Sequence, residues 1–287
     1  KYGRSTGGVM NARSKSGSNN WSFGGNVYYE TELDTSPNTF LAANDVDEAD
    51  DTSVDIFASG AIIKDRLFIY ALYSDNTQDQ RLAGIQSARD FNRSTDEGFW
   101  GVKVDGYLTD NHHFEYTHFS DERVVVEGTY NFDPDSQTRL DYLGDTKYNL
   151  GGENWIATYT GDITDNFQVS LSYGENEQNR LTESATSGEP VVYEYTDANG
   201  FTAFGNWTSF YIDVGDDMRE MSRIDFNWVA GDHDLSFGYD NETNMAVNFT
   251  LPSGGVYWLR DPNNEYNACS PTDCPSGQSV RRRTYAS

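Results

Sequence analysis

Several side chains in this sequence are of types that bind metal ions. The acidic segment 45–51 carries Asp45, Asp47, Asp50 and Asp51, whose carboxylates are the hard oxygen ligands that Ca²⁺ prefers. The segment lacks the glycine and the closing glutamate of an EF-hand loop. We therefore interpret it as a solvated acidic loop, with calcium binding as the alternative, and predict no metal site.

Histidines next to carboxylates raise the question of hydrolysis. In Asp232-His233-Asp234 a carboxylate could orient an imidazole, as in catalytic triads, but the trio lies in a short turn without a serine motif. His112 and His113 lie in another short turn and His118 lies further along the next strand, so we do not expect a shared metal. There is no glycine-rich phosphate loop and no H-E-x-x-H motif. We predict no catalytic residues, no cofactor and no enzymatic activity.

Two cysteines, Cys269 and Cys274, lie close together in a loop rich in Pro, Ser, Asp and Gly. Two thiolates without other soft ligands nearby make a poor zinc site. A local disulfide in an oxidising compartment is the better interpretation.

Aromatic residues gather in the segment 178–219. They include Tyr193, Tyr195, Phe201, Trp207 and Tyr211. Aromatics at this density either contact a ligand or pack on a neighbouring loop, and the sequence leaves both readings open. The run Arg281-Arg282-Arg283 is either an ordinary charged strand end or a group that pairs with lipid phosphates.

The composition limits the classes of protein to which the chain can belong. The 287 residues include 46 Asp and Glu but only 20 Lys and Arg, a net charge of -26 that would repel nucleic acid. Aromatic residues make up 14% of the chain, which argues against disorder. The sequence contains no run of about 18 or more apolar residues, so it predicts no transmembrane helix. A membrane barrel remains compatible, because its strands alternate apolar and polar residues.

Alternation with period two is the dominant pattern, as in Phe167-Gln-Val-Ser-Leu-Ser-Tyr173. Short polar turns near residues 64–66, 109–113, 164–166 and 231–234 separate such runs and predict hairpins. The predicted strands lie near 21–30, 55–64, 67–76, 98–108, 113–122, 154–163, 167–177, 220–229, 234–243 and 279–287.

Between these hairpins we expect long polar loops at 31–54, 77–97, 123–153, 178–219 and 244–278. Strict alternation of short turns with long loops is typical of outer-membrane barrels. The fold class predicted is therefore all-β, a transmembrane antiparallel up-and-down β-barrel.

Three segments resemble one family. The start of the chain, Tyr2-Gly-Arg-Ser-Thr-Gly-Gly-Val9 followed by Asn11 and Lys15-Ser-Gly17, is similar to the end of the plug domain of TonB-dependent outer-membrane receptors. The segment Ser59–Phe68 resembles the segment after the first strand hairpin of Oar-like members of that family, with Gly60-Ala61 in place of the usual Gly-Pro. Such members often carry a carboxypeptidase-regulatory-like domain ahead of the plug. The segment Leu108–His112 with Phe119–Glu122 resembles the next hairpin. The agreement covers residues 2–122, whereas 123–287 match only in rhythm.

The resemblance implies a fragment of a 22-stranded barrel with the last plug strand at its N-terminus. Residues 1–20 would be the end of the plug and 21–287 the first part of the barrel. Gly7, Gly8, Asn11, Lys15 and Gly17 would form the plug–barrel junction.

The function implied is active uptake of a scarce ligand, such as a siderophore, oligosaccharide or peptide, across the outer membrane of a Gram-negative bacterium. Partners would be a TonB-type energy-transducing protein, reached through a missing N-terminal region, and outer-membrane lipid and lipopolysaccharide. The alternatives are a passive porin or adhesin-like barrel, a soluble all-β binding protein and, more distantly, an outer-membrane protease.

Overall fold

The computed structural model describes residues 15–33, 46–84, 88–196, 200–203, 207–260 and 280–283. Apart from one short 3-10 turn, η2 (Ser253–Gly255), the regular structure of these residues consists of β-strands. The strands are β1 (Ser22–Leu33), β2 (Glu48–Ile63), β3 (Leu67–Gly84), β4 (Arg89–Thr109), β5 (His112–Ser120), β6 (Arg123–Asp133), β7 (Thr138–Gly151), β8 (Glu153–Thr164), β9 (Phe167–Ser184), β10 (Val191–Thr196), β11 (Gly200–Ala203), β12 (Tyr211–Ala230), β13 (His233–Pro252), β14 (Tyr257–Arg260) and β15 (Val280–Arg283). No helix among the described residues is long and apolar enough to cross a membrane.

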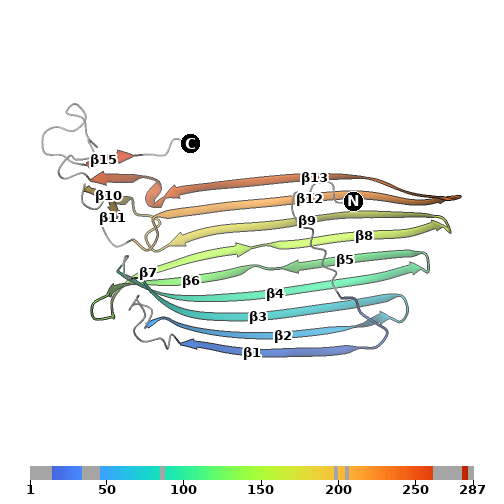
Figure 1. The fold of residues 1–287 in the computed structure, drawn as a ribbon, viewed down its shortest axis with the longest axis horizontal. Helices are drawn as coiled ribbons and strands as arrows, with labels where there is room; N and C mark the ends of the chain where they lie inside the picture. The colour runs from blue at the N-terminus through green and yellow to red at the C-terminus, as the bar shows by residue number, and fades with distance from the viewer. Residues whose placement is uncertain are drawn as a thin grey trace.

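Eleven strands form one antiparallel sheet (Figure 1). Its path runs β1-β2-β3-β4-β5-β8-β9-β12-β13, and β6 and β7 are inserted beside it. β6 pairs with the part of β4 that β5 leaves unpaired. β7 pairs with the part of β9 that β8 leaves unpaired. The sheet therefore has nine rows, and the two rows in its middle are each interrupted once. At these breaks two hydrogen bonds join Asp121, which follows β5, to Gly152, which precedes β8. The Asp121 amide donates to the Gly152 carbonyl (3.2 Å), and the Asp121 carboxylate accepts from the Gly152 amide (3.1 Å).

The four short turns join β2–β3, β4–β5, β8–β9 and β12–β13, as the sequence predicts, and they lie together at one end of the sheet (Figure 1). Two of them use a left-handed backbone, at Asp65 (φ 63°) and at Gly231 (φ 63°). Asp and Gly adopt this conformation more readily than other residues, and it matches the twist of the flanking strands.

At the opposite end the prediction of long loops is largely wrong. Most of 77–97, 123–153 and 178–184 is strand, and so are 48–54, 211–219 and 244–252. Most of these segments carry polar residues on both faces, so the alternation that marks a half-buried strand is weak in them; 244–252 is the exception, because Met245, Val247, Phe249 and Leu251 alternate with smaller or polar residues. Main-chain hydrogen bonds to neighbouring strands hold these polar segments in the sheet.

The tenth predicted strand does not join the main sheet. β15 pairs with β14 in a separate four-stranded sheet of order β11-β10-β14-β15, beyond the long-strand end (Figure 1). The backbone of Arg281–Arg283 therefore lies at the end opposite the short turns.

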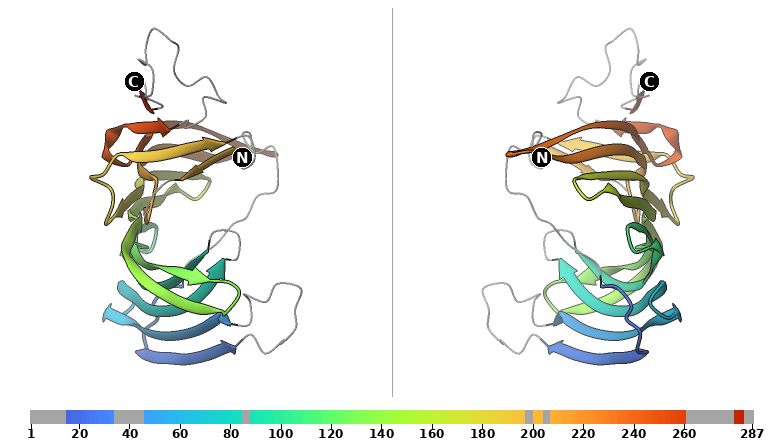
Figure 2. Two further views of the ribbon diagram at one scale, coloured as in Figure 1. Left: turned by 90° about the vertical axis from the view of Figure 1, so that its left-hand side faces the viewer. Right: turned by 90° about the vertical axis from the view of Figure 1, so that its right-hand side faces the viewer.

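The main sheet curves into an arc (Figure 2). β1 and β13 are its two edges and are not paired with each other. The antiparallel all-β prediction is thus confirmed, in the form of a partial ring. Residues 15–21, which lead into β1, lie on the concave side of the arc (Figure 2). We call the face that they contact the inner face and the opposite one the outer face.

An ionic cluster ties three strand extensions together. The carboxylate of Asp90 in β4 is completely buried and accepts hydrogen bonds from Arg81 of β3 (2.7 Å) and Arg139 of β7 (2.8 Å). The Arg139 guanidinium also stacks over the Tyr130 ring, 4.3 Å from its centroid. Burial acts to raise the pKa of Asp90, but the hydrogen bonds and charges of the two arginines outweigh burial and lower the pKa below its ordinary value of 3.8.

We expect Asp90→Asn to destabilise this end of the sheet by about 2 kcal/mol, because it leaves two half-buried arginines without their carboxylate. Asp96→Asn, an exposed position on the same strand and face, is the control. Because the folded-state pKa of Asp90 is lowered, its stabilisation is complete well above pH 3.8 and is lost as the pH falls through the folded-state value. Amide exchange of β4 and β7 at neutral and acidic pH measures both effects; equal exchange in the two variants would contradict the prediction.

Candidate functional site on the concave face

The inner face is polar over much of its width, although the register also places Phe57, Phe68 and Tyr70 on it. Cross-strand partners share a face of a sheet, so the register defines which side chains line it. Hydroxyl and amide groups pair there from strand to strand: Thr158 with Ser172 (3.2 Å), Gln168 with Asp162 (2.9 Å), and Ser236 with Asn227 (2.8 Å). Such a face suits water, polar ligands or a polar segment of protein.

A buried cluster of charges occupies this face near the short turns. β4 supplies Lys103 and Asp105, each 4% exposed, and β5 supplies Glu115 directly opposite Asp105. The ammonium of Lys103 lies 2.7 Å from Glu115 Oε1 and 3.3 Å from Asp105 Oδ1. Because charges at this depth are costly unless paired, the lysine and the carboxylates stabilise one another.

His113 completes the cluster. It lies two residues before Glu115 on the same face of β5, stacked on Tyr107 with ring centroids 4.4 Å apart. One ligand atom from each of Asp105, His113 and Glu115 lies within 4.8 Å of the others. Asp105 Oδ2 and His113 Nε2 are buried without a hydrogen-bond partner.

The segment before β1 docks on this face. Lys103 donates a hydrogen bond to the Ser16 hydroxyl (3.1 Å), and the Lys15 ammonium lies 5.9 Å from the centroid of the Phe57 ring. Gly17 approaches the β2–β3 backbone so closely that a Cβ on it would lie 2.5 Å from the Ile69 carbonyl oxygen. Asn19 then binds Asp65 of the first turn twice, at 2.5 and 2.8 Å. A residue other than glycine at position 17 would push the segment off the sheet.

The outer face is the chemical opposite. Its strands present an apolar band that includes Val27, which is 76% exposed, and Leu171, which is 42% exposed. Aromatic side chains bound the band on both sides. Towards the long-strand end these are Tyr29, Tyr73, Trp100, Trp155 and Tyr173, and towards the short turns they are Phe114, Tyr159, Phe167, Trp228 and Tyr239.

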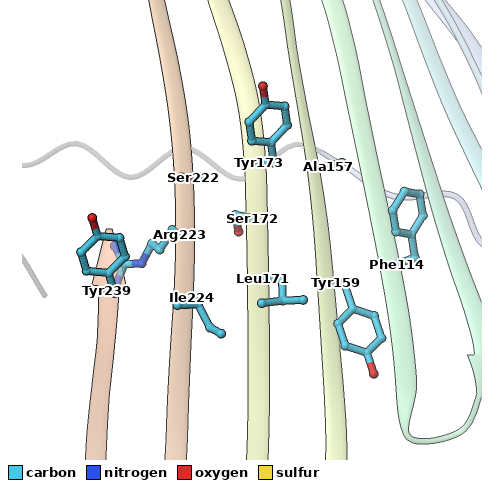
Figure 3. Close-up of a pocket in the computed structure, with 10 residues that line it drawn as sticks. All are labelled: Phe114, Ala157, Tyr159, Leu171, Ser172, Tyr173, Ser222, Arg223, Ile224 and Tyr239. Carbon is cyan, nitrogen blue, oxygen red and sulfur yellow. The ribbon is translucent and has the colours of Figure 1, made fainter. Parts of the chain in front are cut away.

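Within the band an apolar hollow of about 400 Å³ opens on the outer face. Figure 3 shows Leu171 beside the rings of Tyr159 and Tyr173, with Phe114 beyond them and Ile224 between Leu171 and Tyr239. The small side chain of Ala157 leaves the space that these larger groups border. Most of the groups that border the hollow are apolar, and Arg223, Ser172 and Ser222 also line it.

Of the five predicted junction residues, Lys15 and Gly17 lie against the inner face, whereas Gly7, Gly8 and Asn11 lie outside the described residues. Cys269 and Cys274 also lie outside them, so the disulfide stays a prediction.

The acidic segment does not gather its carboxylates. Asp50 and Asp51 are consecutive in β2 and so point to opposite faces, and Asp47 accepts a hydrogen bond from the Ala83 amide (2.8 Å). Asp45 lies outside the described part of the chain.

The histidines lie on both faces of the sheet. His113 points inward, whereas His118 points outward beside Glu153 (3.5 Å), and His112 bonds the Tyr159 hydroxyl (2.7 Å). The turn that contains Asp232 and His233 lies at the exposed short-turn end.

The predicted aromatic cluster belongs to the small sheet and its surroundings. Tyr193 packs on Phe210 and Tyr257, with centroids about 6 Å apart, and its hydroxyl lies 3.2 Å from that of Tyr211. Tyr195 and Phe201 are main-chain partners in β10 and β11, and the indole nitrogen of Trp207 is buried without a partner. Mutual packing accounts for Tyr193 and Tyr211, and ligand contact stays a prediction.

Comparison with protein-family models, with curated proteins and with solved structures gives no match. The fold and its site therefore rest on the chain's own geometry.

We expect Gly17→Ala to undock the segment, because its methyl group would clash with backbone atoms that cannot move aside. Trypsin cuts after Lys15, and its rate should rise about tenfold or more if the clash costs about 1.4 kcal/mol. Gly98→Ala, where the nearest atom to a Cβ lies 4.0 Å away, is the control. Unchanged cleavage of the Gly17→Ala variant would mean that the segment does not depend on this close approach.

Proposed function

We propose that the chain is part of an outer-membrane β-barrel, and that this barrel is a TonB-dependent receptor that takes up a scarce ligand. The observation that carries the membrane part of this proposal is the apolar outer band between two aromatic rows. Interfacial aromatics on either side of an apolar belt are the signature of a barrel in a bilayer.

Burial supports the same conclusion. Among the described residues the buried apolar side chains are only Phe132, Val191 and Leu259, and the long sheet has no second layer packed on it. A soluble sandwich buries one face of each sheet against the other. Here the apolar face needs another covering, and lipid is the covering that fits a band of this kind.

The receptor part of the proposal depends on the inner face and on the docked segment. A polar concave face suits a hydrated lumen. Residues 15–17 lie on that face immediately before the first strand of the sheet, where a plug would join its barrel. Together with the resemblance of residues 2–17 to the end of a plug, this favours a plugged receptor over an open porin. Energy would come from a TonB-type protein of the inner membrane.

Leu171 and Ser172 provide a matched test of membrane insertion, because they are consecutive in β9 and face opposite sides. Leu171→Arg should destabilise the natural protein in lipid bilayers by about 2–4 kcal/mol, whereas Ser172→Arg, facing the lumen, should cost much less. Equilibrium unfolding from liposomes measures both. If both variants fold equally well in buffer without detergent or lipid, the chain belongs to a soluble all-β protein instead.

Conductance and cross-linking separate a receptor from a porin. The natural protein should be electrically silent in planar bilayers, because a plug closes its lumen. It should also cross-link to the energy-transducing protein in intact cells. Steady conductance without such a cross-link would establish the porin alternative.

A further inference from the structure

The geometry points to a divalent transition-metal site formed by Asp105, His113 and Glu115 on the inner face. This site goes beyond the proposed transport function. It is inferred from side-chain positions alone and would stand if that function were refuted.

The register of one hairpin creates the ligand set. β4 and β5 place Asp105 opposite Glu115, and the strand period puts His113 on the same face. Two carboxylates and one imidazole suit a borderline ion such as Zn²⁺, with water in a fourth position. Tetrahedral zinc with bonds of about 2.1 Å needs ligand atoms about 3.4 Å apart. The ligand atoms now lie within 4.8 Å of one another, so small side-chain rotations would close the gap.

Unsatisfied atoms give independent support for a ligand. The side chain of Asp105 is 5% exposed, and its Oδ2 atom has no hydrogen-bond partner. His113 Nε2 is also buried without one. A buried polar atom left without a partner costs free energy, and native proteins rarely leave one unsatisfied. Coordination of a cation between them would satisfy both.

Lys103 is the competitor for this position. Its ammonium already neutralises Glu115 and Asp105, so a metal ion would have to displace it. The same ammonium donates to Ser16 at 3.1 Å. Displacement would therefore also remove the contact that ties residue 16 to the sheet, and metal binding would loosen the docked segment.

Titration of the purified natural protein with Zn²⁺ by calorimetry, and with Co²⁺ by visible absorption, tests the site. We expect one equivalent to bind, and His113→Gln and Asp105→Asn each to weaken binding about tenfold or more. His118→Gln, on the outer face of the same strand, is the matched control and should bind like the wild type. Lys103→Met should bind Zn²⁺ about tenfold more tightly, because the competing charge is gone.

Lys103→Gln provides a second variant if Lys103→Met fails to fold, and circular dichroism checks both. Absence of binding at 1 mM Zn²⁺, or binding that His113→Gln and Asp105→Asn leave unchanged, overturns the site. Trypsin cleavage after Lys15 tests the coupling separately. Zn²⁺ should accelerate it in the wild type but not in His113→Gln, and cleavage insensitive to bound Zn²⁺ overturns the coupling while leaving the site in place.

Discussion

A single curved sheet must find something to cover its apolar face, and most other features of this chain follow from that constraint. Burying apolar surface contributes about 25 cal/mol per Å². Within the described residues, however, side chains such as Phe23 (70% exposed) and Val27 gain little of it from the chain itself. Main-chain hydrogen bonds along nine rows hold the strands together, but they do not cover this band. In the proposed barrel, lipid supplies this covering.

The inner face carries charged groups that also have to be stabilised. Its charges cannot gain from an apolar covering, so they are stabilised by one another, as Lys103 is by Asp105 and Glu115, and Arg93 by Glu127 (2.5 Å). On this face Asp105 Oδ2, His113 Nε2 and the hydroxyls of Thr129 and Thr146 are buried without a hydrogen-bond partner. The docked segment uses the same groups, since Ser16 accepts a hydrogen bond from Lys103. Structural pairing, segment docking and the inferred metal site therefore compete for one set of side chains.

The sequence predicts those parts of the fold in which local pattern and tertiary environment agree. Alternation in Phe167–Tyr173 predicts a half-apolar strand, and turns such as Lys64-Asp65-Arg66 are recognisable from their residue types. Most strand extensions are missed, because residues such as Gln78 and Arg93 carry no periodic signal and are held by neighbouring strands. The extension 244–252 is different, since its alternation of Met245, Val247 and Phe249 does carry that signal. Lys103 and Asp105 can be read as the polar face of a strand. That these two residues lie next to His113 and Glu115 depends on the register of the β4–β5 hairpin. Pairing the two strands across the Thr109–His112 turn is the signal in the sequence that could have revealed this cluster.

The two edges of the sheet, β1 and β13, are not paired with each other. β1 and β13 each expose a row of main-chain donors and acceptors, which water can satisfy and hydrocarbon cannot. If the outer band lies in lipid, both edges must therefore be paired by further strands, because an open edge within a bilayer costs several kcal/mol for each unsatisfied group. The apolar side chains of β13, among them Phe237 and Phe249, keep the outward pattern right up to that edge. In the proposed barrel, an edge that keeps both its alternation and its apolar band would pair with a further strand.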